Sequence, residues 1–273
     1  MRVASIHTYP VKSCHRVDTD RAVVQPWGLA GDRRFMVVDA EGVAVTQREA
    51  PALTGVMPSP RPDGGVRLRA RDLPDLEVPP PLAPPVPVRI WGGTVEAMPA
   101  GDEADAWFTK FLGRPVRLVW LDDPTRRRVN PAYGSPFDRV SFADAHPLLV
   151  TNAASLDRLN EWLREADSPE GPLPMDRFRP SVVVSGAPPW AEDGWVGQRL
   201  RVGTVTFRVA KPCGRCVVTT TDQETGARGT EPLRTLARRR AVDGRLVFGV
   251  LLNPDPPYGE IAVGDPVTVL PAA

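Results

Sequence analysis

The chain has 273 residues, 42% of them hydrophobic and 25% charged, which is the composition of an ordinary globular protein. Its net charge of +1 gives no reason to expect a nucleic-acid or membrane-surface partner. The sequence has neither a signal-peptide pattern nor an apolar run long enough for a transmembrane helix, and its three cysteines are too few for a disulfide framework. We therefore expect a cytoplasmic protein with reduced thiols.

The amino-terminal part of the chain alternates short apolar runs with turn residues. This pattern predicts a hairpin formed by residues 34–39 and 43–46, a half-buried strand at 66–69 and a second hairpin at 88–98. Seven prolines between residues 74 and 87 predict a rigid surface connection, because proline disrupts both helices and central strands.

The first clear helix is predicted to begin at Asp102, where acidic residues complement the helix dipole, and to end at Gly113. A strand at 116–121 follows it. The next segment is rich in proline and arginine, which is typical of a connection between domains. We therefore predict an N-terminal β-rich domain of residues 1–122 and a second domain of residues 123–273.

The second half combines a few helices with many short strands. Thr151 or Asn152 caps a predicted helix with apolar residues at helical spacing, and residues 231–240 form a short basic helix. Strands are predicted at 147–150, 181–184, 200–202, 205–209, 246–252 and 267–270. The predicted fold class is mixed α+β and predominantly β, with a closed or nearly closed barrel in this half.

Common nucleotide and metal motifs are missing from the sequence. No phosphate-binding P-loop or glycine-rich dinucleotide motif occurs, and the three histidines are too far apart for a zinc site or a catalytic triad. The segment 211–216, Lys-Pro-Cys-Gly-Arg-Cys, is a turn in which cations lie beside two thiols. Neighbouring cations stabilise the thiolate, which is the form that binds soft metals.

The residues of this segment leave several alternatives open. A zinc site normally needs four ligands, and no second Cys-x-x-Cys is present. A dithiol redox pair is expected at the start of a helix, whereas this pair leads into a β-branched run. The remaining alternatives are a single thiolate ligand to a metal otherwise held by a cofactor, and cysteines that are merely structural.

A second basic cluster lies in the N-terminal part of the chain. It combines residues 9–14 (Tyr-Pro-Val-Lys-Ser-Cys), residues 28–35 with two adjacent arginines, and residues 46–49 (Thr-Gln-Arg-Glu). Exposed amides, a hydroxyl group and several arginines suit a phosphorylated ligand, because guanidinium pairs with phosphate through two hydrogen bonds. Ordinary surface charge is the alternative for each motif taken singly.

Together these segments resemble the MOSC superfamily, in the branch that has an N-terminal MOSC-associated domain and includes the mitochondrial amidoxime reducing component and its bacterial relatives. The resemblance covers nearly the whole chain, and its motifs keep their order. They are Tyr-Pro-Val-Lys-Ser-Cys at 9–14, Gly-Asp-Arg-Arg-Phe at 31–35, Phe-Arg-Pro at 178–180, Cys-Gly-Arg-Cys at 213–216 and Val-Gly-Asp-Pro-Val at 263–267.

The resemblance implies a MOSC β-barrel and a molybdenum cofactor (Mo-molybdopterin) whose metal is bound by Cys216. The pterin and its phosphate would be bound by Lys12, Ser13 and Arg33. Further implied cofactor contacts come from Thr151, Asn152, Arg179, Gly214 and Arg215. Relatives have an asparagine where this chain has Ser181, so the contact from Ser181 would be shorter or mediated by water.

The implied activity is the reduction of N-hydroxylated or N-oxide substrates. Asp222 is the second candidate catalytic residue after Cys216, with an ordinary turn aspartate as the alternative. Leu251 stands where the mitochondrial relatives have a tyrosine, which predicts a different substrate pocket. The chain lacks the four cysteines of the iron–sulfur domain found in some bacterial relatives. A separate electron-donor protein of ferredoxin, flavodoxin or cytochrome type is therefore expected, and we expect a monomer.

Two other functions are compatible with the same motifs. MOSC domains have also been proposed to carry sulfur as a cysteine persulfide, which would again use Cys216. A non-enzymatic binding module is the third possibility. Only the oxidoreductase predicts stoichiometric molybdenum in the purified protein.

Overall fold

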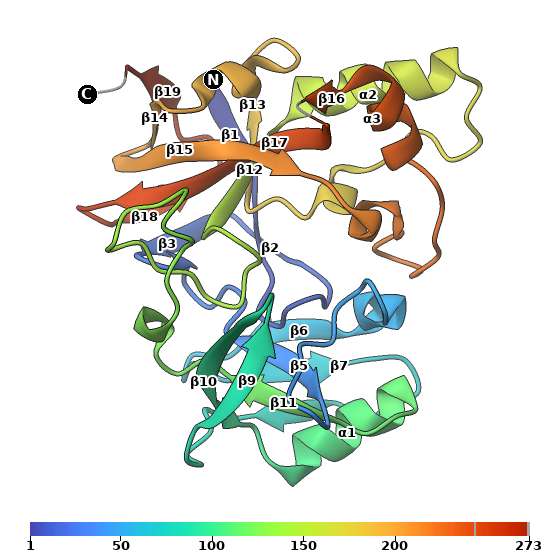
Figure 1. Cartoon of the computed structure of the whole chain (residues 1–273), viewed down its shortest axis with the longest axis vertical. Coiled ribbons are helices and arrows are strands. Elements are labelled where there is room, and N and C mark those ends of the chain that lie inside the picture. The colour runs from blue at the N-terminus through green and yellow to red at the C-terminus, as the bar shows by residue number, and fades with distance from the viewer. Residues whose placement is uncertain (243, 272–273) are drawn as a thin grey trace.

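The computed structural model describes residues 1–242 and 244–271, which form two lobes (Figure 1). The upper lobe is built around a large sheet and contains both the first strand and the last strand of the chain. The lower lobe comes from the amino-terminal half and carries α1 (Asp102–Leu112). The predicted fold class, mixed α+β and predominantly β, is confirmed.

The upper lobe is a β-barrel with the strand order β19-β14-β15-β17-β12-β13-β1-β2. Its strands are β1 (Arg2–Thr8), β2 (Val17–Thr19), β12 (Leu148–Asn152), β13 (Val182–Ser185), β14 (Arg199–Val202), β15 (Val205–Gly214), β17 (Arg245–Asp255) and β19 (Val267–Leu270), with β16 (Ala241–Val242) paired to β17. All six strands predicted in the second half are present. β12 and β13 run parallel, which requires a crossover, and α2 (Ala153–Glu165) supplies it.

The amino-terminal strand closes this barrel. β1 pairs with β13 on one side. On the other, Val3 N donates to the Asp265 carbonyl oxygen at 3.0 Å, and Val267 N donates to the Met1 carbonyl oxygen, just before β1, at 2.9 Å. A bulge just after Val3 shifts the alternation of the strand, so both Val3 and Ile6 face the barrel core. The sequence predicted the barrel but not the strand that closes it.

The lower lobe packs two sheets against α1. Their orders are β5-β11-β10-β9 and β6-β7-β8. The strands are β5 (Phe35–Asp39), β6 (Met57–Pro60), β7 (Val66–Arg69), β8 (Leu76–Val78), β9 (Val86–Ile90), β10 (Gly93–Pro99) and β11 (Val116–Trp120). α1 buries Trp107 and Phe108 in this core, and its start at Asp102 and its end at Gly113, in the left-handed conformation, are confirmed.

Two predictions for this lobe were wrong in part. The proline-rich segment contains a short strand, β8, which proline tolerates because β8 lies at a sheet edge and its own residues are not proline. Residues 43–46 do not form a regular strand after β5. They make isolated bridges instead, Val38 with Ala44 and Val43 with Arg89, because the segment passes between two strands rather than along one.

A fourth sheet pairs an early segment of the chain with a late one: β18 (Glu260–Ala262) pairs with β3 (Arg21–Gln25), which pairs with β4 (Gly28–Leu29). The short basic helix is α3 (Leu233–Arg239). Single-turn 3-10 helices complete the structure: η1 (Pro51–Gly55), η2 (Pro124–Arg126), η3 (Met175–Phe178), η4 (Ala191–Trp195) and η5 (Val217–Thr220). In the described parts of the chain, no helix has the length and apolar character needed to cross a membrane.

The predicted domain boundary after residue 122 stays a prediction. The structure adds that β1 and β2, which belong to the predicted N-terminal domain by sequence, lie in the sheet of the barrel lobe. The first two strands therefore belong to the barrel lobe, although the predicted boundary assigns them to the N-terminal domain.

Removing side-chain volume from β1 is expected to destabilise the whole barrel. Ile6 is 1% exposed, so Ile6→Ala leaves a cavity and lowers the free energy of unfolding by about 2–5 kcal/mol. Urea denaturation measures this change. Ala4→Ser on the exposed side of the same strand is the control. Equal stability of the two variants would contradict the role of buried β1 side chains in stabilising the barrel.

Candidate active site

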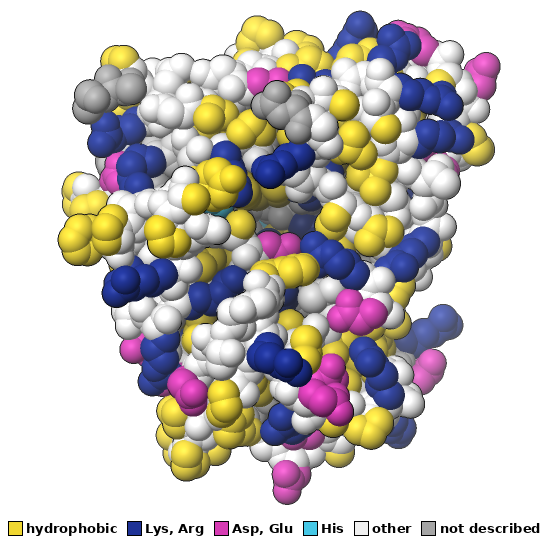
Figure 2. Space-filling model, viewed as in Figure 1, with side chains coloured by type: hydrophobic (Ala, Val, Ile, Leu, Met, Phe, Trp, Pro, Cys, Tyr) yellow, Lys and Arg dark blue, Asp and Glu magenta, His cyan; other side chains and the backbone are white. Residues whose placement is uncertain are grey.

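A cavity of about 340 Å³ lies between the two lobes. Figure 2 shows the hollow at the centre of one face, surrounded by basic side chains. The lower-lobe side contributes Lys12, Ser13, Arg33, Thr46 and Arg48. The barrel side contributes residues 143–147, Leu149, Phe178, Arg179, residues 211–216, Val218, Arg245 and Leu251. This volume falls within the usual range of small-molecule sites.

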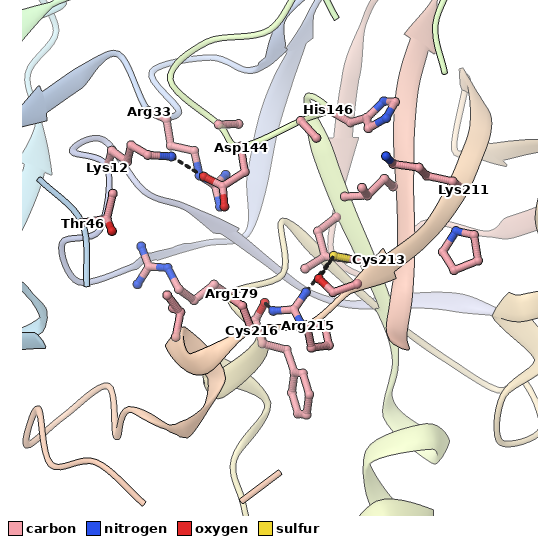
Figure 3. Close-up of a pocket in the computed structure, with 18 of the residues that line it drawn as sticks. Lys12, Arg33, Thr46, Asp144, His146, Arg179, Lys211, Cys213, Arg215 and Cys216 are labelled. Carbon is pink, nitrogen blue, oxygen red and sulfur yellow. Dashed lines mark hydrogen bonds and ion pairs between the residues drawn. The ribbon is translucent and has the colours of Figure 1, made fainter. Parts of the chain in front are cut away.

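The thiols occupy the barrel side of the cavity. β15 ends at Gly214, and Cys216 then caps η5, so that both Cys213 and Cys216 line the cavity (Figure 3). Arg48 Nη2 donates a hydrogen bond to Cys216 Sγ at 3.2 Å. Arg215 Nη1 donates to Cys213 Sγ at 2.8 Å. A guanidinium beside a sulfur stabilises the thiolate.

Arg48 reaches the thiol because the loop before it is fixed. The side chain of Gln47 is fully buried, donates to the Ser13 carbonyl oxygen at 2.7 Å and exchanges hydrogen bonds with Gln223. Arg228 donates to the backbone carbonyl oxygens of Gln47 and Arg48. Arg48 thus comes from the lower lobe and binds a sulfur of the barrel lobe.

An ion pair occupies the opposite wall. Lys12 Nζ contacts the Asp144 carboxylate and donates to the Phe142 carbonyl oxygen at 2.8 Å. Burial lowers the pKa of Lys12 to about 8, although Asp144 opposes this shift. Burial acts to raise the pKa of Asp144, but the charges of Lys12, Arg48 and Arg33 outweigh it and hold that pKa well below its usual range. Asp144 is therefore an ionised carboxylate within a cationic wall.

Two further arginines are held against one aromatic ring. The guanidinium carbons of Arg33 and Arg179 lie 4.4 Å and 4.2 Å from the centre of the Tyr9 ring. Burial raises the pKa of Tyr9 to about 12, and its hydroxyl donates to the Pro180 carbonyl oxygen at 3.1 Å. The ring is thus a neutral, fixed support that directs both cations towards the cavity.

The backbone of this wall is strained where its side chains enter the cavity. Ser13, Arg33 and Arg179 have φ values of +68°, +48° and +53°, in the left-handed region that residues with a Cβ rarely adopt. Such strain persists only where the surroundings impose it, and it concentrates at functional sites. It supports a ligand-binding role for this wall.

The structure brings most of the predicted site residues together. Those that line the cavity are Lys12, Ser13, Arg33, Arg179, Gly214, Arg215 and Cys216. The thiol of the second half therefore shares one cavity with the lysine and arginine of the amino-terminal segment. Leu251, where relatives have a tyrosine, also lines it.

Thr151, Asn152 and Ser181 do not line the cavity, which corrects the expectation of a direct ligand contact. All three are buried. Asn152 is used as the cap of α2, accepting from Ala154 N at 3.2 Å, and Ser181 Oγ accepts from Leu149 N at 3.3 Å. The Thr151 hydroxyl is buried without a hydrogen-bond partner among the described residues.

Asp222 is also not among the residues that line the cavity. Its carboxylate accepts hydrogen bonds from the backbone N–H groups of Glu224 and Thr225 and pairs with Arg177 at 3.1 Å. Burial acts to raise its pKa, but these hydrogen bonds and the Arg177 charge hold the pKa of Asp222 below its ordinary value. The geometry corresponds to the turn aspartate that was the alternative to a catalytic role.

The sequence missed several residues of the cavity. Arg48 was seen only as part of the basic cluster at 46–49, and its contact with Cys216 depends on lobe packing that the sequence does not reveal. Lys211 was seen only as one of the cations beside the two thiols, and Asp144 had no signal beyond its charge. A carboxylate in the middle of an irregular segment becomes informative only when a buried lysine is seen beside it.

The lining suits an anionic ligand that brings its own metal. Among the described residues it holds seven lysine or arginine side chains and one carboxylate, Asp144. No group of three or more His, Cys, Asp or Glu residues able to hold a metal ion occurs in residues 1–242 and 244–271. The protein thus offers a metal a thiolate but not a complete ligand set, which fits a dithiolene-bearing, phosphorylated cofactor.

Comparison with known proteins defines the class. Residues 1–115 match the family described as the MOSC N-terminal beta barrel domain, and residues 138–268 match the MOSC domain. The chain therefore belongs to the MOSC superfamily, in the branch with the N-terminal domain, as its motifs predicted.

Relatives in this branch are of two kinds. The chain is 34% identical to mitochondrial amidoxime-reducing component 1 of Homo sapiens, over 98% of this chain and 82% of that protein. It is 31% identical to mitochondrial amidoxime reducing component 2 of Bos taurus, over 97% and 82%. It is 30% identical to the molybdenum cofactor sulfurase of Danio rerio, over 92% of this chain but 31% of that longer protein.

The three cysteines are expected to differ sharply in reactivity. Cys14 is fully buried and burial raises its pKa to about 12, whereas Cys213 and Cys216 are partly exposed in the cavity. Because the thiolate is the nucleophile, iodoacetamide should alkylate Cys213 and Cys216 in the folded protein and Cys14 only after unfolding in urea. Peptide mass spectrometry measures this pattern. Equal labelling of Cys14 before unfolding would contradict the described packing.

Proposed function

We propose that this protein is a molybdenum-cofactor-dependent oxidoreductase that reduces N-hydroxylated or N-oxide compounds, with Cys216 as its ligand to the metal. The observation that carries the proposal is the cavity between the lobes, in which a free thiol and a wall of lysine and arginine side chains share one space. The two groups of relatives, by their names, support both the cofactor and the class of reaction.

In this proposal the metal is held from the barrel side alone, whereas the pterin and its phosphate are held from both sides of the cavity. Cys216 holds the metal from the barrel side, where Gly214 and Arg215 flank it. Lys12, Ser13, Arg33 and Arg179 hold the pterin and its phosphate, because ammonium and guanidinium groups pair with phosphate oxygens. When bound, the cofactor supplies the two-electron chemistry that removes the oxygen of an N–O group as water.

Other charged side chains of the cavity supply positive charge and a hydrogen-bond acceptor. Arg48 donates a hydrogen bond to the Cys216 sulfur and so places a positive charge beside the proposed metal ligand. Asp144, whose side chain is 57% exposed in the cavity, accepts a hydrogen bond from the N–H or O–H group of a substrate. Lys12 holds a proton at Nζ at neutral pH, because its pKa of about 8 lies above that pH, so its ammonium group is charged where the phosphate binds.

The proposal includes a separate electron donor of ferredoxin, flavodoxin or cytochrome type, since Mo reduction needs a source of electrons outside the chain. It also includes a cytoplasmic location and a monomer. A small N-hydroxylated molecule reaches the cavity through the hollow seen in Figure 2.

Cys216→Ser is expected to abolish reductase activity and to lower the molybdenum content, because a neutral hydroxyl is a poor ligand for a soft metal. Metal analysis and reduction of benzamidoxime with an artificial electron donor, on protein from a host that makes molybdopterin, measure both effects. Cys213→Ser is the matched control, since Cys213 lines the same cavity beside another arginine. Equal molybdenum and activity in wild type and Cys216→Ser would refute the assignment.

Sulfur transfer through a persulfide on Cys216 is the second candidate function, favoured by the molybdenum cofactor sulfurase relatives. The experiment above separates the two. An oxidoreductase contains stoichiometric molybdenum, whereas a sulfur carrier contains a cyanide-releasable sulfur on Cys216 and no stoichiometric metal. A binding module contains neither.

Cofactor retention is expected to depend on pH through Lys12. An ammonium group binds phosphate and a neutral amine does not, so retention should fall as the pH rises through about 8. Loss of this charged contact weakens binding by about 1.5–3 kcal/mol. Lys12→Arg should remove the pH dependence because guanidinium stays charged. Pterin fluorescence after gel filtration at several pH values measures retention, and a parallel fall in both proteins would contradict the role of Lys12.

A further inference from the structure

The tip of the β9–β10 hairpin carries an exposed aromatic residue at the mouth of the cavity. Trp91 and Gly92 form the two-residue turn between Ile90 and Gly93. The Trp91 side chain is not packed in the lobe core, and the residue remains 50% exposed. A large half-exposed indole beside a ligand cavity calls for an explanation, since exposure of so much apolar area to water is unfavourable.

The backbone at this turn makes tryptophan a costly choice. Trp91 has a φ of +51° and Gly92 a φ of +76°, so both turn residues are left-handed. Turns of this type favour Asn-Gly, because asparagine and glycine adopt positive φ with little strain. The backbone conformation therefore does not explain a tryptophan here, and the explanation must lie in the contacts of its side chain.

The side chain contacts residues of both walls of the site. The Arg48 guanidinium carbon lies 4.2 Å from the centre of the indole ring, and the Lys12 ammonium lies 5.7 Å from it. Indole Nε1 donates to Asp144 Oδ1 at 3.2 Å. Because Arg48 also binds Cys216, a single guanidinium separates the indole ring from the sulfur.

We propose that Trp91 is a specificity-determining residue, an aromatic wall at the mouth that selects planar, conjugated N-hydroxylated substrates. The substrate class named here rests on the proposed function. Trp91 is not itself among the residues that line the cavity, but Arg48 and Asp144, which do line it, fix the ring beside it, and the exposed part of the ring offers a flat apolar surface there. A planar substrate covers this surface by offset stacking, which an aliphatic substrate of similar polarity cannot do.

Trp91→Asn is the decisive variant. It creates the preferred Asn-Gly turn, so the melting temperature should stay equal or rise while the aromatic wall is lost. Wild type and variant, both loaded with cofactor, are compared on benzamidoxime, which is aromatic, and acetamidoxime, which carries a methyl group instead. The preference in kcat/KM for benzamidoxime should fall about tenfold in the variant, mainly through KM.

Trp91→Phe is the matched control, because it keeps a ring on Arg48 and should retain most of the preference. Calorimetric titration of wild type and Trp91→Asn with benzamidoxime provides a readout that needs no turnover. An unchanged preference in Trp91→Asn, or an equal loss on both compounds, would overturn the role of Trp91 while leaving the reductase proposal intact. Wild type that binds benzamidoxime more tightly than acetamidoxime, through Trp91, but reduces neither would refute the reductase proposal alone.

Discussion

The hydrogen bonds that hold β1 between β13 and the segment before β19 determine where the rest of the site can form. They close the barrel with the first strand of the chain, and the chain then leaves that strand directly into residues 9–14. Lys12 and Ser13 are therefore delivered to the edge of the barrel, next to a thiol that lies about two hundred residues later in sequence. The cavity is a consequence of this single long-range pairing.

The cavity concentrates like charges that repel one another. Asp144 is the only carboxylate among its described lining residues, and the cations are kept apart by Tyr9 and by the ion pair with Lys12. At the effective dielectric constant of a protein, neighbouring unit charges still interact by a few kcal/mol. Binding of a multiply charged anion relieves this repulsion. Part of the binding free energy of the ligand therefore comes from removing a repulsion that is present in the free protein.

Much of this arrangement could be predicted from the sequence. Short strands, one helix in the first half and two in the second were readable from the sequence. The ordered motifs identified the superfamily and seven of the residues that line the cavity. Other features depended on tertiary contacts. Thr151, Asn152 and Ser181 carry the right atoms, but they are buried and do not line the cavity. Trp91 had no sequence signal, and Arg48 had none beyond its place in the basic cluster at 46–49, because their roles arise where one lobe meets the other.

The position of β1 also affects how the protein can be made. During synthesis this strand emerges before two of the segments to which it is hydrogen-bonded, β13 and the segment just before β19. The lower lobe, from β5 to β11, can reach its own core in the interval because its sheets pair within that stretch. Until those segments have been made, the nascent chain carries a folded lobe and a strand, β1, whose pairing is limited to β2, which is a natural target for chaperones.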